Sequence, residues 1–296
     1  MMKSWIKAMR LRTLPLAWAA STMGGSLAAL NGHWDWGIYA LSLLTAFSLQ
    51  IASNLANDYG DAASGLDGEN REGPSRTIQE GLISSTQMKR AIVLASVLAF
   101  AFGLWLIFYT FIDWVVSLVF VMLGVVAIVA ALKYTMGKNP YGYAGFGDLF
   151  VLIFFGWVGV GCSYFLYAQS WDLTILLPAS SLGLLAVAVL NVNNIRDIKS
   201  DEASGKFSIP VRIGRAKAVV YHGFILFTSV LLMALFGWIS DFQISQWLFL
   251  LATPLMIRNW LAVKNETESM KLDPYLKQMA LTTLLVVVLF VIGNLI

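Results

Sequence analysis

Nine long stretches without a charged residue constrain the fold of this chain more than any other feature. The stretches are 13–34, 36–57, 91–112, 114–132, 149–171, 173–195, 218–240, 242–257 and 278–296. A helix needs about 20 apolar residues to cross the hydrocarbon layer of a bilayer, and about 17–25 are tolerated. The stretch 242–257 is short, but the Arg258 side chain can reach toward the interface while its helix continues. We therefore predict an all-α integral membrane protein with nine transmembrane helices.

The overall composition agrees with an integral membrane protein and argues against several other classes. Hydrophobic residues make up 58% of the 296 positions and charged residues only 12%, whereas soluble domains carry about 25% charged residues. A formal net charge of +3 is too small to indicate a nucleic-acid partner, so we expect the lipid bilayer and no nucleic acid. No segment outside the stretches is long enough to bury a core of its own. Residues 1–296 are therefore expected to form a single domain.

The basic residues are distributed so unevenly that they predict a topology. All 20 Lys and Arg residues lie in the N-terminal segment or in alternate connections, whereas the other connections carry only Asp35, Asp113, Asp172 and Asp241. Cytoplasmic connections of membrane proteins are enriched in Lys and Arg. We therefore expect a multi-pass protein of the plasma (inner) membrane with its N-terminus in the cytoplasm.

Two polar stretches end the second and the sixth apolar runs in the same way. The first contains Asn54, Asn57, Asp58 and Asp61, and the second contains Asn193, Asn194, Asp197 and Asp201. Residues three, four and seven apart share one face of a helix, so each set predicts a stripe of carboxylates and amides. Both stripes fall at expected cytoplasmic ends. We predict that they face each other across a central cavity that opens to the cytoplasm.

Such stripes have a metal-binding interpretation and a structural one. Carboxylates crowded on one face repel each other unless a cation lies among them. Hard oxygen ligands without His or Cys suit Mg²⁺, so Asp58, Asp61, Asp197 and Asp201 are the candidate ligands. The alternative is a pair of solvated helix ends, although two matching stripes make that explanation weaker.

Basic residues follow both carboxylate pairs and are suited to the remaining oxygens of a metal-bound polyphosphate. They are Arg71 and Arg76 after the first pair, and Lys206 and Arg212 after the second. The competing explanation is that the cytoplasmic side of a membrane protein carries basic residues regardless of any ligand.

Several strings in the chain resemble the UbiA-type intramembrane aromatic prenyltransferase superfamily. They are Asn57-Asp58-Tyr59-Gly60-Asp61, Gly73-Pro74-Ser75-Arg76, Pro140-Tyr141-Gly142-Tyr143, Asn193-Asn194-Ile195-Arg196-Asp197 and Val211-Arg212-Ile213-Gly214. Within the superfamily they are most similar to the enzymes that prenylate 1,4-dihydroxy-2-naphthoate in menaquinone synthesis. The resemblance implies nine helices around a cavity and Mg²⁺ bound to an isoprenoid diphosphate. Tyr134 and Lys138 match a family motif thought to act near the diphosphate.

One departure from the family pattern concerns the first motif. Many members carry a third aspartate four residues after the position of Asp61, and this chain has Gly65 there. Asp67 is a possible replacement.

The resemblance implies transfer of a polyprenyl group from its diphosphate to 1,4-dihydroxy-2-naphthoate, with loss of diphosphate and CO₂. The expected catalytic residues are Asn54, Asn57, Asp58, Asp61, Tyr134, Asn193, Asp197, Asp201 and Lys206, and the expected diphosphate-binding residues are Arg71, Arg76, Lys138, Lys206 and Arg212. An acceptor of the 4-hydroxybenzoate type is the first alternative. A transporter is the second, but a transport path requires polar groups facing both sides, and the outer half of this chain is nearly devoid of ionisable groups.

Overall fold

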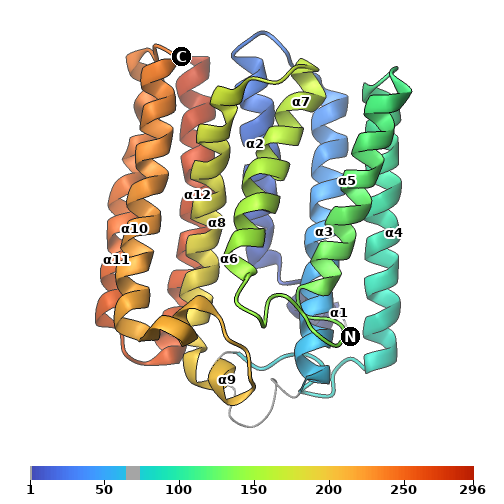
Figure 1. Cartoon of the computed structure of the whole chain (residues 1–296), viewed down its shortest axis with the longest axis vertical. Coiled ribbons are helices and arrows are strands. Elements are labelled where there is room, and N and C mark those ends of the chain that lie inside the picture. Colours follow the sequence, from blue (N-terminus) through green and yellow to red (C-terminus); the bar gives the residue numbers. More distant parts are fainter. Residues whose placement is uncertain (1, 65–73) are drawn as a thin grey trace.

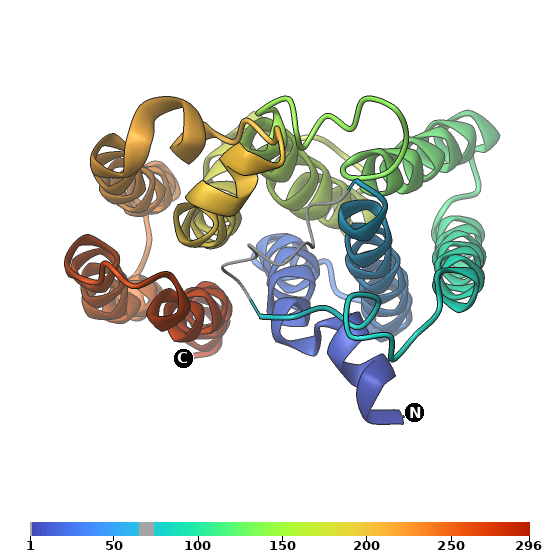
Figure 2. The same ribbon diagram turned by 90° about the horizontal axis from the view of Figure 1, so that it is seen from below.

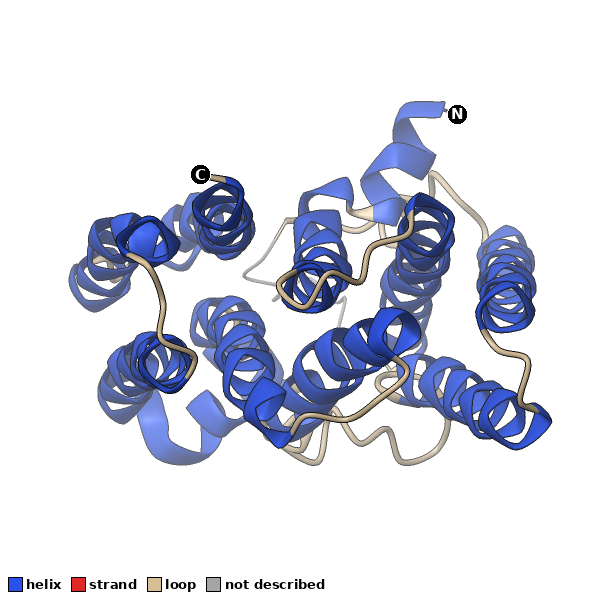
Figure 3. Ribbon diagram, turned by 90° about the horizontal axis from the view of Figure 1, so that it is seen from above, coloured by secondary structure: helices blue, strands red, loops and turns tan. Residues whose placement is uncertain are grey.

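The chain folds into a bundle of helices, and its computed structural model describes residues 2–64 and 74–296 (Figures 1 and 3). The helices of the first half are α1 (Met2–Met9), η1 (Leu11–Thr13), α2 (Leu14–Ala29), α3 (Trp36–Ala63), α4 (Ser85–Thr110), α5 (Trp114–Lys133), α6 (Gly147–Val151), η2 (Leu152–Cys162) and α7 (Ser163–Ala168). Those of the second half are η3 (Leu173–Ile175), α8 (Leu176–Arg196), α9 (Ile198–Ala203), α10 (Ile209–Ile239), η4 (Ile244–Ala252), α11 (Thr253–Asn265), η5 (Ser269–Leu272) and α12 (Asp273–Leu295). No strand occurs within these described ranges.

Seven helical segments of the described chain are long and apolar enough to cross a membrane. They are Trp36–Ala63, Ser85–Thr110, Trp114–Lys133, Gly147–Ala168, Leu173–Arg196, Ile209–Ile239 and Ser269–Leu295. The other two predicted stretches correspond to α2, which has 16 residues, and to η4 with α11, which carries Arg258. Both run alongside the longer helices (Figure 1). The prediction of an all-α, multi-pass membrane protein is therefore confirmed.

The helices pack side by side, with α4 and α5 at one flank and α10 and α11 at the other (Figure 1). Between the flanks, α8 packs against α10, η2 and α12, and α2 packs against α7, η2 and α12. The connections that precede α2, α6, α10 and α12 lie at one end of the bundle, together with the described residues of the connection before α4, and this end is seen face-on in Figure 2. We call this the basic end, because the described Lys and Arg residues lie in or near these connections.

The acidic residues of the opposite end have a structural role. Asp35, Asp113 and Asp172 each precede a helix, and their carboxylates accept hydrogen bonds from backbone N–H groups of its first turn at 2.7–2.8 Å. A carboxylate in this position satisfies N–H groups that have no partner within the helix. These three Asp residues thus serve as helix caps.

The helices η2 and α8 pack closely against each other inside the bundle. Gly156 and Gly183 meet there, and a Cβ on Gly156 would lie 2.5 Å from the carbonyl oxygen of Ala179. Small residues allow helix backbones in a membrane to approach closely. The π-helical segment η2 also contributes residues such as Phe154 and Val158 to the cavity described below.

A buried polar network joins the helices of the second half. His222 on α10 is fully buried; its Nδ1 lies 3.3 Å from Asn191 Nδ2 on α8, and its Nε2 lies 3.0 Å from Asn259 Oδ1 on α11. Asn259 in turn donates to the carbonyl oxygen of Tyr275 on α12 at 2.9 Å. Because every polar group must find a partner inside the membrane, this network fixes four helices relative to one another.

We expect the substitution His222→Leu to lower the stability of the protein by about 2 kcal/mol or more, because it removes two buried hydrogen bonds and leaves Asn259 Oδ1 without its His222 partner. Thermal unfolding of the purified protein in detergent measures the effect as a lower Tm. The exposed His33 provides the matched control, and His33→Leu should leave Tm unchanged. Equal shifts for both variants would contradict a structural role of the network.

Candidate active site

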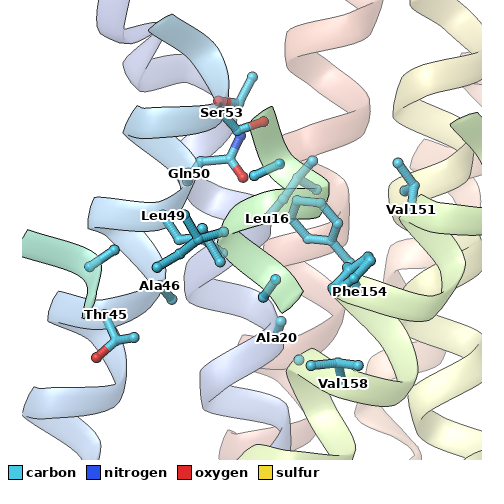
Figure 4. A pocket seen from close by; sticks show the side chains of 18 of the residues that line it. Leu16, Ala20, Thr45, Ala46, Leu49, Gln50, Ser53, Val151, Phe154 and Val158 are labelled. Atoms are coloured by element: carbon cyan, nitrogen blue, oxygen red, sulfur yellow. Dashed lines mark hydrogen bonds between the residues drawn. The ribbon is translucent and has the colours of Figure 1, made fainter. Parts of the chain in front are cut away.

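A cavity of about 420 Å³ lies between α2, α3, α4, α5, η2 and α8. Most of its wall is apolar, and Leu16, Leu49, Phe154 and Val158 face the same space (Figure 4). Gln50 and the neighbouring turn of α3 lead from this apolar part toward the basic end. The cavity therefore has an apolar body and a polar head, which suits an amphiphilic ligand.

Residues far apart in the sequence meet at the polar head. Its lining comprises Arg10, Arg12, Asn54, Asn57, Asp61, Arg76, Tyr134, Asn193 and Lys206. Asp58, Asp197 and Asp201 lie directly behind this lining and are at least nine-tenths buried. The structure thus brings together both predicted motifs and two of the predicted diphosphate-binding residues, Arg76 and Lys206.

Asp58 and Asp61 of α3 are held by basic and phenolic side chains. Arg10 Nη2 lies 2.5 Å from Asp58 Oδ1. Arg76 forms an ion pair with Asp61, and its Nη1 is also 3.7 Å from Asp58 Oδ1. The Tyr143 hydroxyl donates to Asp61 Oδ1 at 2.5 Å, and the pKa of Tyr143 is raised by burial and by Asp61, so the hydroxyl keeps its proton. Positive charge therefore occupies the place where a metal ion was predicted.

The second motif lies where α8 ends, so the predicted stripe crosses a break in the helix. Asp197 separates α8 from α9 with φ −96° and ψ 11°. Its N–H still donates to the carbonyl of Asn193 at 3.1 Å, and its own carbonyl accepts from Asp201 at 2.8 Å. Arg196 binds both oxygens of Asp197, with its Nε and Nη2 each at 2.7 Å. The three motif residues consequently remain on successive turns despite the break.

The turn after α9 explains why a glycine and a lysine follow the second motif. Gly205 has φ +72°, a left-handed conformation that glycine adopts without strain and that commonly ends helices. This turn lets the Lys206 N–H donate to the carbonyl of Asp201 at 2.8 Å and returns Lys206 Nζ to the Asp201 carboxylate at 3.0 Å. Lys206 therefore approaches the motif from the basic end.

The surroundings of Asp201 disfavour the ionised form of its carboxylate. Its pKa is raised to about 6, chiefly by burial; Lys206 opposes this shift, and the negative charges of Asp197 and Asp61 contribute to it. A second positive charge near this carboxylate would stabilise its ionised form.

The amides of the first motif anchor backbone around the head. Asn57 Oδ1 accepts from Thr135 Oγ1 at 3.1 Å, and the Asn57 carbonyl accepts from Arg76 Nη1 at 2.7 Å. Asn54 Nδ2 donates to Thr13 Oγ1 at 2.9 Å. In this structure the Asn54 amide therefore holds the residue that precedes α2, the Asn57 amide holds Thr135, and Arg76 is held by the backbone carbonyl of Asn57.

The remaining predicted residues differ in their positions. Tyr134 lines the head and packs edge-on against Tyr141, with ring centroids 5.5 Å apart. Arg212 is exposed and donates to the carbonyls of Ala144 and Phe207, and Lys138 is exposed without an ion pair to any described residue. The structure thus does not bring Lys138 or Arg212 to the carboxylates, and Arg71 lies outside the described residues.

Sequence reasoning did not identify five charged or phenolic residues of this cluster: Arg10, Arg12, Tyr143, Arg196 and Asp273. Asp273 accepts from Arg12 Nη1 at 2.7 Å and from Arg196 Nη1 at 2.5 Å. Tyr143 and Arg196 lie in strings that carry the family resemblance, but no role was assigned to them. Arg10 and Arg12 directly precede an apolar run, a position that membrane topology also explains.

The donor atoms of the head are hard oxygens, and this chemistry fits Mg²⁺. Within the described ranges, however, no group of three or more His, Cys, Asp or Glu side chains is close enough to share a metal ion. Each of the four motif carboxylates is instead paired with an Arg or Lys. A cation can therefore bind to these carboxylates only if the Arg and Lys side chains move away to pair with another anion.

The chain belongs to the UbiA prenyltransferase family, whose model matches residues 18–273. It is 44% identical to the 1,4-dihydroxy-2-naphthoate octaprenyltransferase of Escherichia coli over 98% of this chain and 94% of that protein. The fold is similar to the apo structure of a UbiA homologue from Aeropyrum pernix, with a TM-score of 0.70, 15% identity and coverage of 94% and 96%. A UbiA homologue from Archaeoglobus fulgidus bound to GPP and Mg²⁺ gives a TM-score of 0.63, 15% identity and coverage of 97% and 99%. The resemblance drawn from the motifs is thus confirmed.

Proposed function

We propose that this protein transfers a polyprenyl group from an isoprenoid diphosphate to 1,4-dihydroxy-2-naphthoate, releasing diphosphate and CO₂. The observation that carries the proposal is the meeting of two carboxylate motifs at the polar head of an apolar cavity. The near full-length similarity to the Escherichia coli 1,4-dihydroxy-2-naphthoate octaprenyltransferase supports both the reaction and the acceptor.

The apolar body of the cavity suits the prenyl chain and the cation that forms on it. When the allylic C–O bond breaks, positive charge spreads over the allyl group. Aromatic side chains such as Phe150 and Phe154 line the body, and ring faces attract cations. The apolar wall also excludes water that would capture the cation. The electron-rich naphthoate ring then attacks at the carbon that bears the carboxylate, so that CO₂ leaves as the ring regains its aromaticity.

The charged head suits the diphosphate. Asp58, Asp61, Asp197 and Asp201 are the residues that would hold Mg²⁺, and the A. fulgidus homologue bound to GPP and Mg²⁺ supports this cofactor. When bound, the metal neutralises the leaving diphosphate. Arg76 and Lys206, which pair with Asp61 and Asp201 in this structure, would then be able to donate to diphosphate oxygens. The arriving anion thus replaces the carboxylates as the partner of these buried basic groups.

We also propose that all nine helical segments cross the plasma (inner) membrane, with the basic end in the cytoplasm. The orientation is supported by the described Lys and Arg residues, which lie at the same end of the bundle as the polar head of the cavity. Cytoplasmic connections of membrane proteins are enriched in these residues. In this orientation, water-soluble diphosphate leaves on the cytoplasmic side.

The direct test is prenyl transfer by membranes that contain the protein, assayed with Mg²⁺ and with EDTA. We expect Mg²⁺-dependent prenylation of 1,4-dihydroxy-2-naphthoate and little of 4-hydroxybenzoate in a parallel reaction. A preference for 4-hydroxybenzoate would assign the protein to the other acceptor class. Full activity in EDTA would reject the role of a divalent cation, and no transfer to either acceptor would reject the function.

Tyr143 is expected to support the reaction by holding Asp61 in place. The substitution Tyr143→Phe removes a hydrogen bond to a buried carboxylate, a loss of about 1.5–3 kcal/mol for a charged acceptor. We therefore expect kcat to fall by roughly tenfold or more. Tyr109 provides the control, because its hydroxyl donates to Asp35 at 3.3 Å at the opposite end of the bundle. Tyr109→Phe should retain full activity, and equal rates for both variants would contradict the role of Tyr143.

A further inference from the structure

Arg196 is the basic residue most completely enclosed in the cluster, with 2% exposure. Its guanidinium contacts three side chains. Nε and Nη2 bind Asp197, Nη2 also donates to Asn193 Oδ1 at 2.9 Å, and Nη1 donates to Asp273 Oδ1 at 2.5 Å. The charge of Arg196 is therefore shared between one motif carboxylate and one carboxylate outside the motifs.

Asp273 is held where its negative charge is favourable. It is the first residue of α12, and the N-terminus of a helix stabilises a carboxylate. Arg12 Nη1 donates to its second oxygen, Oδ2, at 2.7 Å. The side chain is 23% exposed, so Asp273 lies between the buried Arg196 and the more accessible Arg12. Arg12 and the N-terminus of α12 thus hold Asp273 in place independently of Asp197.

This arrangement decides whether Asp197 can bind a cation. Both oxygens of Asp197 are occupied by Arg196, so binding a metal requires at least one of them to leave the guanidinium. An enclosed guanidinium without a counter-charge is strongly unfavourable. Asp273 supplies the counter-charge that remains when Asp197 turns away, because its contact uses a different nitrogen of the same guanidinium.

We propose that Asp273 is a positioning residue, which holds Arg196 while Asp197 turns to the divalent cation; this inference rests on the proposed function. Without the Asp273 charge, Arg196 would bind Asp197 more tightly and would compete better against the metal. Residues that orient metal ligands commonly change metal affinity by about 10–100-fold when they are replaced.

The test measures Mn²⁺ binding to the purified protein by the loss of the free Mn²⁺ signal in electron paramagnetic resonance, without substrate. We expect Asp273→Asn to weaken Mn²⁺ binding about tenfold. In an Arg196→Gln variant, adding Asp273→Asn should not weaken Mn²⁺ binding further, because Asp273 acts through the guanidinium that this variant lacks. Asp113→Asn makes the same chemical change at a helix N-cap of the opposite end and should leave Mn²⁺ binding unchanged.

Two results with Asp273→Asn would each overturn the inference. One is unchanged Mn²⁺ binding by Asp273→Asn. The other is the same loss in both backgrounds, which indicates a general effect of charge rather than an action through Arg196. If Arg196→Gln does not fold, Arg196→Lys takes its place, since it keeps the charge but cannot bind both carboxylates as a fork. If Asp273→Asn does not fold, Asp273→Glu replaces it: retained Mn²⁺ binding supports the inference, and a tenfold loss despite the retained charge overturns it.

Failure of this inference can be distinguished from failure of the proposed function. Prenyl transfer by the parent protein tests the function by itself. A parent protein that transfers prenyl groups but binds no Mn²⁺ in the absence of diphosphate would overturn the role of Asp273 and leave the proposed function standing.

Discussion

Replacing Asp61 by Asn should lower prenyl transfer by about 10²–10³-fold, the effect typical of losing one group that stabilises transition-state charge. Asn keeps the shape of the side chain but removes the charge that would bind the metal. Asp61 is also the motif carboxylate that lines the cavity and contacts both Arg76 and Tyr143. Its replacement therefore weakens metal binding and disturbs the basic groups around the diphosphate.

Initial rates at several Mg²⁺ concentrations measure this loss, and Tm establishes that the variant is folded. Asp172→Asn is the matched control, because Asp172 caps η3 at the opposite end of the bundle and should not affect the rate. Wild-type turnover by Asp61→Asn would remove Asp61 from the site.

Lys206→Ala is expected to lower kcat/KM for the prenyl diphosphate by about 10²-fold, because a charge-assisted contact to a phosphate oxygen contributes about 1.5–3 kcal/mol. KM for the aromatic acceptor should change much less. Lys206 lines the polar head and is 7% exposed, so the loss concerns a group enclosed with the ligand.

The control for Lys206 is Lys217→Ala, which removes a lysine from the exposed surface of α10. Steady-state kinetics with either substrate varied separate the two effects. Unaltered kinetics toward the prenyl diphosphate in Lys206→Ala would contradict its contact with the leaving group.

The helices could be predicted from the sequence because their cause is local. The charge-free stretches of the sequence predicted where each helical segment lies, but they did not predict every helix end. The second charge-free stretch ends at residue 57, whereas α3 continues through the predicted stripe of Asn and Asp residues to Ala63. The helix continues because Arg10 and Arg76 neutralise Asp58 and Asp61, and no local pattern predicts partners so distant along the chain.

The candidate site could be predicted only in part, for the same reason. The spacing of Asn and Asp identified both motifs, and a basic residue close behind each motif identified Arg76 and Lys206. Arg196 lies beside Asp197 in the sequence, yet its link to Asp273 depends on how α8 packs against η5 and α12. Lys138 was expected near the diphosphate from a motif, whereas the loop that carries it places this side chain at the surface. Contacts between distant segments therefore required the structure.

The most direct test of the central claim uses 1,4-dihydroxy-2-naphthoate labelled in its carboxyl group. The purified protein is supplied with this acceptor, a polyprenyl diphosphate and Mg²⁺, and both the prenylated product and labelled CO₂ are followed over time. Coupling at the carbon that bears the carboxylate predicts an unlabelled product and an equal amount of labelled CO₂. A prenylated product that retains the label would contradict the account.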